Sequence, residues 1–107
     1  MKNWKFIDEP NTAIITLKEI LVGKSEITYV THDMDGAWQF IKNDSKSTKT
    51  ENATLVGLGE IISLDSSLIT LFDLPRGWFA WRDNNKSSWH REKSNGDKSD
   101  IKRRSVF

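Results

Sequence analysis

Residues 27–41 read ITYVTHDMDGAWQFI and decide the fold, because two strand-like runs flank a short acidic turn that ends in glycine. Side chains alternate between the two faces of a strand, so Ile27 and Tyr29 share one face of the first run. For the same reason Trp38 and Phe40 share one face of the second run. The two aspartates between the runs then lie at the tip. This pattern predicts a β-hairpin.

Helix signals lie on both sides of the hairpin. Thr16 is followed three residues later by Glu19, which is the spacing of a capping box, so we expect a helix to begin at Thr16 and end at Gly23. Residues 58–63 resemble a second short helix. Asp65 supplies a further N-cap, and the apolar stripe that follows it ends before a proline.

Further strands are expected on both sides of these helices, at residues 13–16, 53–57 and 78–82. The residues between 42 and 52 are all polar and predict an exposed loop. Together these elements predict an α+β fold, in which an antiparallel sheet of about four to five strands packs against two short helices. A flexible C-terminal tail follows.

Aromatic side chains supply much of the expected core. Each ring buries about 150–250 Å² when it is enclosed, so Trp38, Trp78 and Trp81 are assigned to the core first. The alternative is an aromatic platform that stacks bases or sugars. Such a platform needs a basic groove, whereas the strands that hold these residues belong to the acidic part of the chain.

The 107 residues predict one domain over residues 1–91 and a basic, disordered tail over 92–107. Residues 1–81 carry 8 Lys and Arg against 11 Asp and Glu, whereas residues 82–107 carry 8 against 4. The chain has no cysteine, which excludes disulfides and thiolate chemistry. We expect a cytoplasmic monomer without a cofactor or a membrane span.

His32, Asp33 and Asp35 lie close together at the hairpin tip and suggest an acid–base pair or a metal site. The local alternative is that both aspartates accept hydrogen bonds from the turn and that Gly36 supplies a positive φ. A calcium loop starting at Asp33 fails, because tryptophan stands where that loop needs glycine. The local reading is favoured, so no catalytic or metal-binding residue is assigned.

Trp89 is surrounded by basic residues in the last quarter of the chain. It either folds back over the edge of the sheet or anchors a partner. The alternative function that it suggests is a small nucleic-acid module, in which the basic residues between Arg82 and Arg104 bind phosphates and the ring stacks on a base.

A resemblance to a known family runs over about residues 4 to 90. It is carried by residues 11–13, 27–33, 36–40, 58–62, 74–78 and 80–82, which read NTA, ITYVTHD, GAWQF, LGEII, LPRGW and AWR. With these motifs the chain resembles a family of small uncharacterised bacterial proteins. That family is similar to the single-domain immunity proteins of polymorphic toxin systems.

The resemblance implies that the protein binds a toxin stoichiometrically and is not an enzyme. The partner-binding residues expected on this hypothesis are His32, Asp33, Asp35 and Trp89, and acidic surfaces would suit a toxin with a basic cleft. Surface carboxylates are further contact candidates, namely Asp8, Glu9, Glu51 and Glu60.

Overall fold

The hairpin predicted at residues 27–41 is present, and its two strands are the central pair of a β-sheet. Strand β2 (Tyr29–His32) pairs antiparallel with β3 (Trp38–Ile41), and Val30 lies opposite Phe40 in this register. The computed structural model describes residues 4–42 and 52–94.

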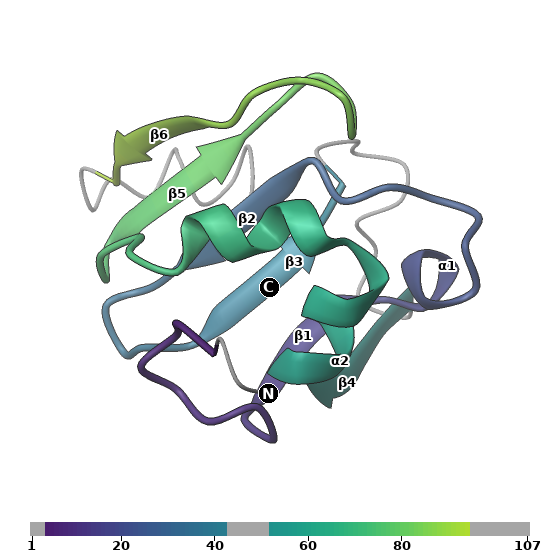
Figure 1. Cartoon of the computed structure of the whole chain (residues 1–107), viewed down its shortest axis with the longest axis horizontal. Helices are drawn as coiled ribbons and strands as arrows, with labels where there is room; N and C mark the ends of the chain where they lie inside the picture. Colours follow the sequence, from purple (N-terminus) through teal and green to yellow (C-terminus); the bar gives the residue numbers. More distant parts are fainter. Residues whose placement is uncertain (1–3, 43–51, 95–107) are drawn as a thin grey trace.

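Four more strands extend the sheet on both sides of the hairpin, in the order β4-β1-β3-β2-β5-β6 (Figure 1). They are β1 (Ala13–Leu17), β4 (Ala53–Gly57), β5 (Trp78–Trp81) and β6 (His90–Lys93). The α+β class is therefore confirmed. The sheet has six strands and is mixed, because β1 pairs parallel with β3 while the other neighbours are antiparallel.

The differences from the predicted antiparallel sheet of four to five strands have physical reasons. β1 inserts between β3 and β4, so its parallel pairing depends on long-range packing that local alternation does not encode. All four side chains of β6 are exposed, so this strand has no apolar periodicity. β6 extends two residues past the expected domain boundary at 91, and the part of the tail beyond Ser94 lies outside the described residues.

Within residues 4–42 and 52–94, the sheet is accompanied by the short helical segments α1 (Lys18–Leu21), α2 (Leu58–Leu64) and the 3₁₀ helix η2 (Ser66–Leu71). Figure 1 shows α2 and η2 in front of the sheet. The predicted capping box is wrong, because the Thr16 hydroxyl donates 2.6 Å to the Phe40 carbonyl and Thr16 stays in β1. Asp65 does cap η2, since its carboxylate accepts the Ser67 N–H at 3.0 Å.

The core lies between the sheet and these helices. Trp38 is 2 % exposed and fully part of it, whereas Trp78 and Trp81 are half-buried and pack at its margin. Side chains with no more than 1 % exposure come from every layer, including Ile14, Leu17, Val30, Phe40, Ile41, Leu58, Ile61, Leu68 and Leu71.

The loop expected between residues 42 and 52 falls almost entirely outside the described residues. In the described ranges no helix is long and apolar enough to span a bilayer.

Candidate functional site

The predicted partner-binding residues lie at opposite ends of the sheet. β2 and β5 run antiparallel, with His32 opposite Trp78 and Tyr29 opposite Trp81. The hairpin tip, defined here as residues 33–37, therefore lies at the end where β5 begins. Trp89 follows the end of β5 and lies at the other end of the strands. His32, Asp33 and Asp35 are brought together on one hairpin, and Trp89 is not.

The hairpin tip is fixed by hydrogen bonds within the turn. The Asp33 carboxylate accepts the backbone N–H groups of Asp35 at 3.0 Å and Ala37 at 2.9 Å. The Asp33 carbonyl accepts the Gly36 N–H at 3.0 Å, and the Asp33 N–H donates to the Ala37 carbonyl at the same distance. Gly36 has a φ of +92°, which a residue with a side chain adopts only with strain. The Asp33 carboxylate therefore holds the turn, while the Asp35 side chain is exposed.

The turn before β5 contacts the hairpin tip. The Gly77 N–H donates to the His32 carbonyl at 2.6 Å. A Cβ on Gly77 would lie 2.5 Å from the Met34 sulfur, and one on Gly36 would lie 2.8 Å from an Arg76 nitrogen. Because Gly77 and Gly36 have no side chain, Met34 can lie against the first and Arg76 against the second. Met34 is nevertheless 73 % exposed, so it presents an apolar surface between the two aspartates.

His32 is tied to the core and not to the neighbouring carboxylates. Its Nδ1 lies 2.7 Å from the Leu74 carbonyl oxygen, so Nδ1 carries the proton that this acceptor requires. The imidazole stacks on Trp38, with ring centroids 3.9 Å apart. Both turn N–H groups bond to Asp33 Oδ1, and the His32 Nδ1–H is directed at the Leu74 carbonyl, so Nδ1 does not donate to Asp33. Among residues 4–42 and 52–94, no group of three or more His, Cys, Asp and Glu side chains gathers to hold a metal.

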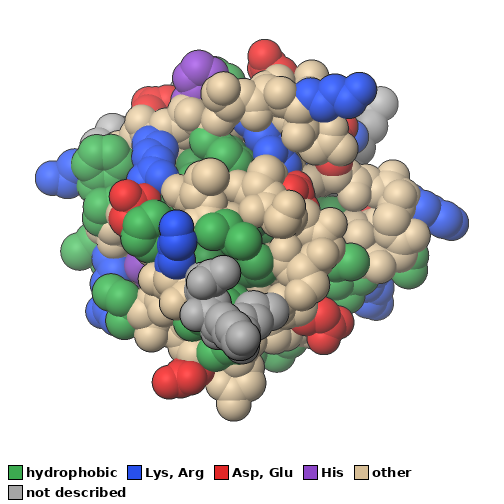
Figure 2. All heavy atoms as spheres, in the orientation of Figure 1, with side chains coloured by type: hydrophobic (Ala, Val, Ile, Leu, Met, Phe, Trp, Pro, Cys, Tyr) green, Lys and Arg blue, Asp and Glu red, His purple; other side chains and the backbone are tan. Residues whose placement is uncertain are grey.

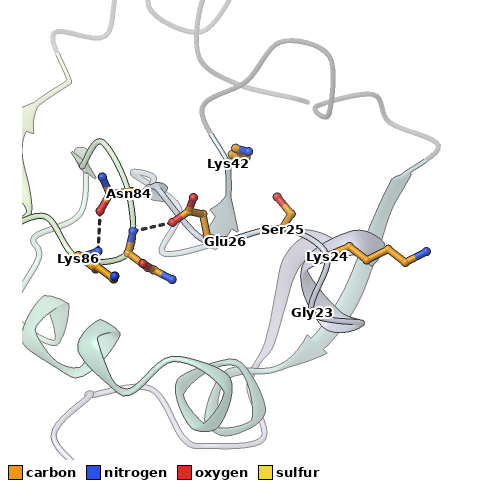
Figure 3. Close-up of a pocket in the computed structure, with 8 residues that line it drawn as sticks. Gly23, Lys24, Ser25, Glu26, Lys42, Asn84 and Lys86 are labelled. Atoms are coloured by element: carbon orange, nitrogen blue, oxygen red, sulfur yellow. Dashed lines mark hydrogen bonds between the residues drawn. The ribbon is translucent and has the colours of Figure 1, made fainter.

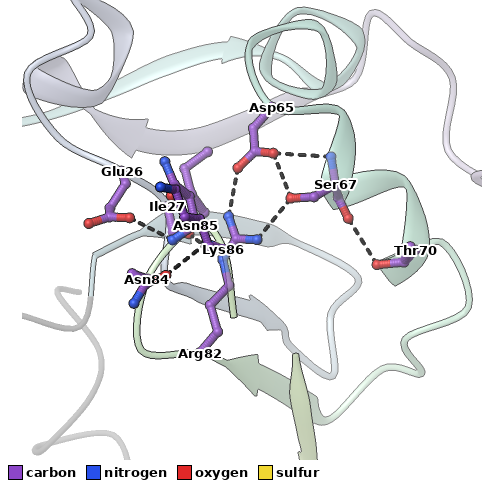
Figure 4. A network of polar contacts seen from close by, with 9 residues as sticks. All are labelled: Glu26, Ile27, Asp65, Ser67, Thr70, Arg82, Asn84, Asn85 and Lys86. Carbon is purple, nitrogen blue, oxygen red and sulfur yellow. Dashed lines mark hydrogen bonds and ion pairs between the residues drawn. The ribbon is translucent and has the colours of Figure 1, made fainter. Parts of the chain in front are cut away.

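A buried arginine organises the opposite end of the sheet (Figure 4). Arg82 is 1 % exposed, and its guanidinium donates to the Ile27 carbonyl at 3.0 Å, the Ser67 hydroxyl at 2.8 Å and the Asp65 carboxylate at 2.6 Å. The guanidinium carbon also lies 4.2 Å from the centroid of the Trp89 ring. Trp89 is half-buried and packs against the core. One face of its ring is therefore covered by Arg82.

A polar hollow of about 560 Å³ opens beside this arginine (Figure 3). Its walls are two loops, residues 23–26 and 84–86, together with Lys42. Glu26 accepts the Asn85 N–H at 2.6 Å and so links the two loops. Figure 3 shows the Lys24 side chain extending away from the hollow. The remaining side chains do not converge on one point, so the hollow lacks the geometry of an acid–base or nucleophilic centre.

Sequence reasoning missed Met34, Arg76 and Arg82 as organising residues. Arg82 carried a usable signal, because a charged side chain directly follows the apolar strand at 78–81 and needs a buried partner. The contacts of Met34 and Arg76 with the two glycines depend on the approach of separate turns, which no local pattern encodes. Comparison with protein-family models, curated proteins and solved structures finds no match to this chain.

Proposed function

We propose that the chain is a non-enzymatic protein-binding domain that contacts its partner through the hairpin tip. In the version implied by its family resemblance, it is an immunity protein that neutralises a toxin by stoichiometric binding. One observation carries the proposal, namely that a fixed turn presents the exposed side chain of Met34 between the carboxylates of Asp33 and Asp35.

The hairpin tip is ordered before it meets a partner. The Asp33 carboxylate, the positive φ of Gly36 and the Gly77 hydrogen bond all fix its backbone. Ordering a loop at an interface costs free energy, so a loop that is already fixed retains more of its contact energy as affinity. This rigidity favours binding without a change in the conformation of the hairpin tip.

The chemistry of the hairpin tip indicates the kind of partner. Methionine adapts its shape to irregular apolar pockets, and the flanking carboxylates favour cationic surroundings. A basic cleft with an apolar floor fits both features. Figure 2 shows acidic and basic side chains interspersed on the helix-covered face, so charge on that face does not select one sign of partner.

The surface carboxylates expected as contacts differ in their roles. Asp8 accepts the indole N–H of Trp38 at 2.8 Å and is therefore part of the fold. Glu9 and Glu60 are exposed, and Glu51 lies outside the described residues. Glu60 lies on α2, away from the hairpin tip, and thus provides a matched control for a charge reversal.

The test is affinity capture with the tagged chain from its native cells, followed by measurement of stoichiometry and affinity for the captured protein. We expect Asp35→Lys to weaken binding at least tenfold, which corresponds to about 1.4 kcal/mol, and Glu60→Lys to leave it unchanged. Asp35 is chosen because its side chain is exposed, whereas Asp33 holds the turn. Recovery of no stoichiometric protein partner, or equal affinities for the two variants, would refute the proposal.

A further inference from the structure

The two edges of the sheet differ sharply in chemistry. β6 carries His, Arg, Glu and Lys in sequence, and charged edge strands resist pairing with other chains. β4 reads Ala-Thr-Leu-Val-Gly and has neither a charge nor a proline. Leu55, at its centre, is 66 % exposed. Figure 1 shows β4 at the border of the sheet, and the sheet order ends with it.

The hydrogen-bond phase of β4 follows from its pairing with β1. Leu58 donates its N–H to the Thr12 carbonyl at 2.8 Å, so these two residues form a hydrogen-bonded pair. The next pair along the two strands is Ala13 opposite Gly57. Along an antiparallel strand, the backbone N–H and C=O groups of one residue point to the strand on one side, and those of the next residue point to the strand on the other side. Thr54 and Val56 therefore bond to β1, and the N–H and C=O groups of residues 53, 55 and 57 point outward. Among residues 4–42 and 52–94, no backbone group of a turn or loop hydrogen-bonds to these outward groups.

We propose that the β4 edge binds β4 of a second copy of this chain, antiparallel about a two-fold axis at Leu55. In this register Leu55 faces its own symmetry mate, and Ala53 faces Gly57 of the other copy. Each facing pair exchanges two hydrogen bonds, which satisfies the outward backbone groups of both copies. The two sheets become one continuous twelve-stranded sheet across the axis.

Three features favour a second copy over other occupants. The strand is self-complementary, because its small end residues Ala53 and Gly57 face each other and its single large exposed side chain faces itself. The pairing also closes, since the same edge is used in both copies. The charged β6 edge opposes the β4-to-β6 pairing that would propagate a fibre.

The expected dimer is concentration-dependent, because a five-residue edge forms a small interface. Stable interfaces bury about 1,200–2,000 Å² in total, and one strand pair falls toward the lower end or below it. Sedimentation velocity over a series of protein concentrations is the direct measurement. We expect the wild-type chain to shift from monomer to dimer as its concentration rises.

Leu55→Lys places a charge at the centre of the proposed pair and should raise the dimer dissociation constant at least tenfold. Val22→Lys is the matched control, because Val22 is 67 % exposed and follows α1 instead of lying on the edge. Asp35→Lys should leave the dimer intact, which separates this inference from the proposed binding function. A wild-type chain that stays monomeric at the highest concentration, or equal dimerisation of the two lysine variants, would overturn it.

The absence of native cysteine allows a second test of the register. Facing residues in a hydrogen-bonded pair lie about 5.5 Å apart at Cα, within the range of about 4.4–6.8 Å that a disulfide spans. We expect Leu55→Cys to form a covalent dimer under mild oxidation at least ten times faster than Val22→Cys. Equal rates would contradict the two-fold axis at Leu55. Capture of another protein by wild type but not by Leu55→Lys, without self-association, would assign the edge to a different partner and overturn the dimer.

Discussion

Replacement of Arg82 by methionine tests how much of the fold depends on one buried guanidinium. The side chain joins the segment before β2, the cap of η2 and the ring of Trp89, and it is 1 % exposed. Methionine keeps most of the apolar stem and removes all three donors. The loss of stability in Arg82→Met should therefore come mainly from the lost polar contacts and less from an empty cavity.

The expected loss follows from the groups that remain. The Ile27 carbonyl loses its donor in a buried site, which costs about 1–3 kcal/mol. Loss of the stacking contact with Trp89 adds about 0.5–2 kcal/mol. Asp65 is 23 % exposed and still accepts two bonds from Ser67, so its share is smaller than that of a fully buried carboxylate. We expect Arg82→Met to lower the free energy of unfolding by about 3–4 kcal/mol.

Urea unfolding followed by tryptophan fluorescence measures this loss, provided that the slope with urea stays constant. Arg91→Met is the matched control, because Arg91 also pairs with an aspartate, at 2.7 Å, but the two side chains are 33 % and 57 % exposed. Exposed pairs contribute about 0–1 kcal/mol, so Arg91→Met should cost no more than that. A loss below about 1 kcal/mol for Arg82→Met, or equal losses for both variants, would refute the role given to Arg82.

Two further predictions concern the turn glycines and the Asp73 carboxyl. Gly77→Ala should destabilise the fold more than Gly23→Ala, because both glycines have a positive φ but only Gly77 would place its Cβ against Met34; equal midpoints of urea unfolding would contradict this. The hydrogen bond from Arg91 lowers the pKa of Asp73 below its ordinary value of 3.8, so its contribution to stability is present above that value and is lost as pH falls through the lowered pKa. The Asp73→Asn variant should therefore lose less stability than the wild type as the pH falls below 3.8. Identical dependence of stability on pH in the two proteins would contradict a contribution from the Asp73 carboxylate.

The local elements of the fold could be predicted because their signals are local. Gly36 and Gly23 both have a positive φ, as the turn and the helix end require, and Asp65 caps η2 through its own carboxylate. Thr16 shows where this reasoning fails. Its hydroxyl finds the Phe40 carbonyl on a neighbouring strand, and this long-range bond replaces the local cap.

The candidate site was predictable only in part. The acidic turn marked the hairpin tip, but the orientation of His32 depends on the Leu74 carbonyl, which lies 42 residues further along the chain. The support from Gly77 likewise joins two turns that are distant in sequence. The phase of the β4 edge needed the register with β1, because alternation within β4 does not say which backbone groups are already bonded.

The position of β1 between β3 and β4 has a consequence during synthesis on the ribosome. Both neighbours of β1 are made later, and the second is complete only when residue 57 has been added. Until β3 has been made, Ile14 and Ile15 belong to a segment with two unpaired backbone edges, and the edge that faces β4 stays unpaired until residue 57 has been added. Nascent chains arrested before β4 should therefore depend on chaperones, whereas those that extend past it can bury this segment.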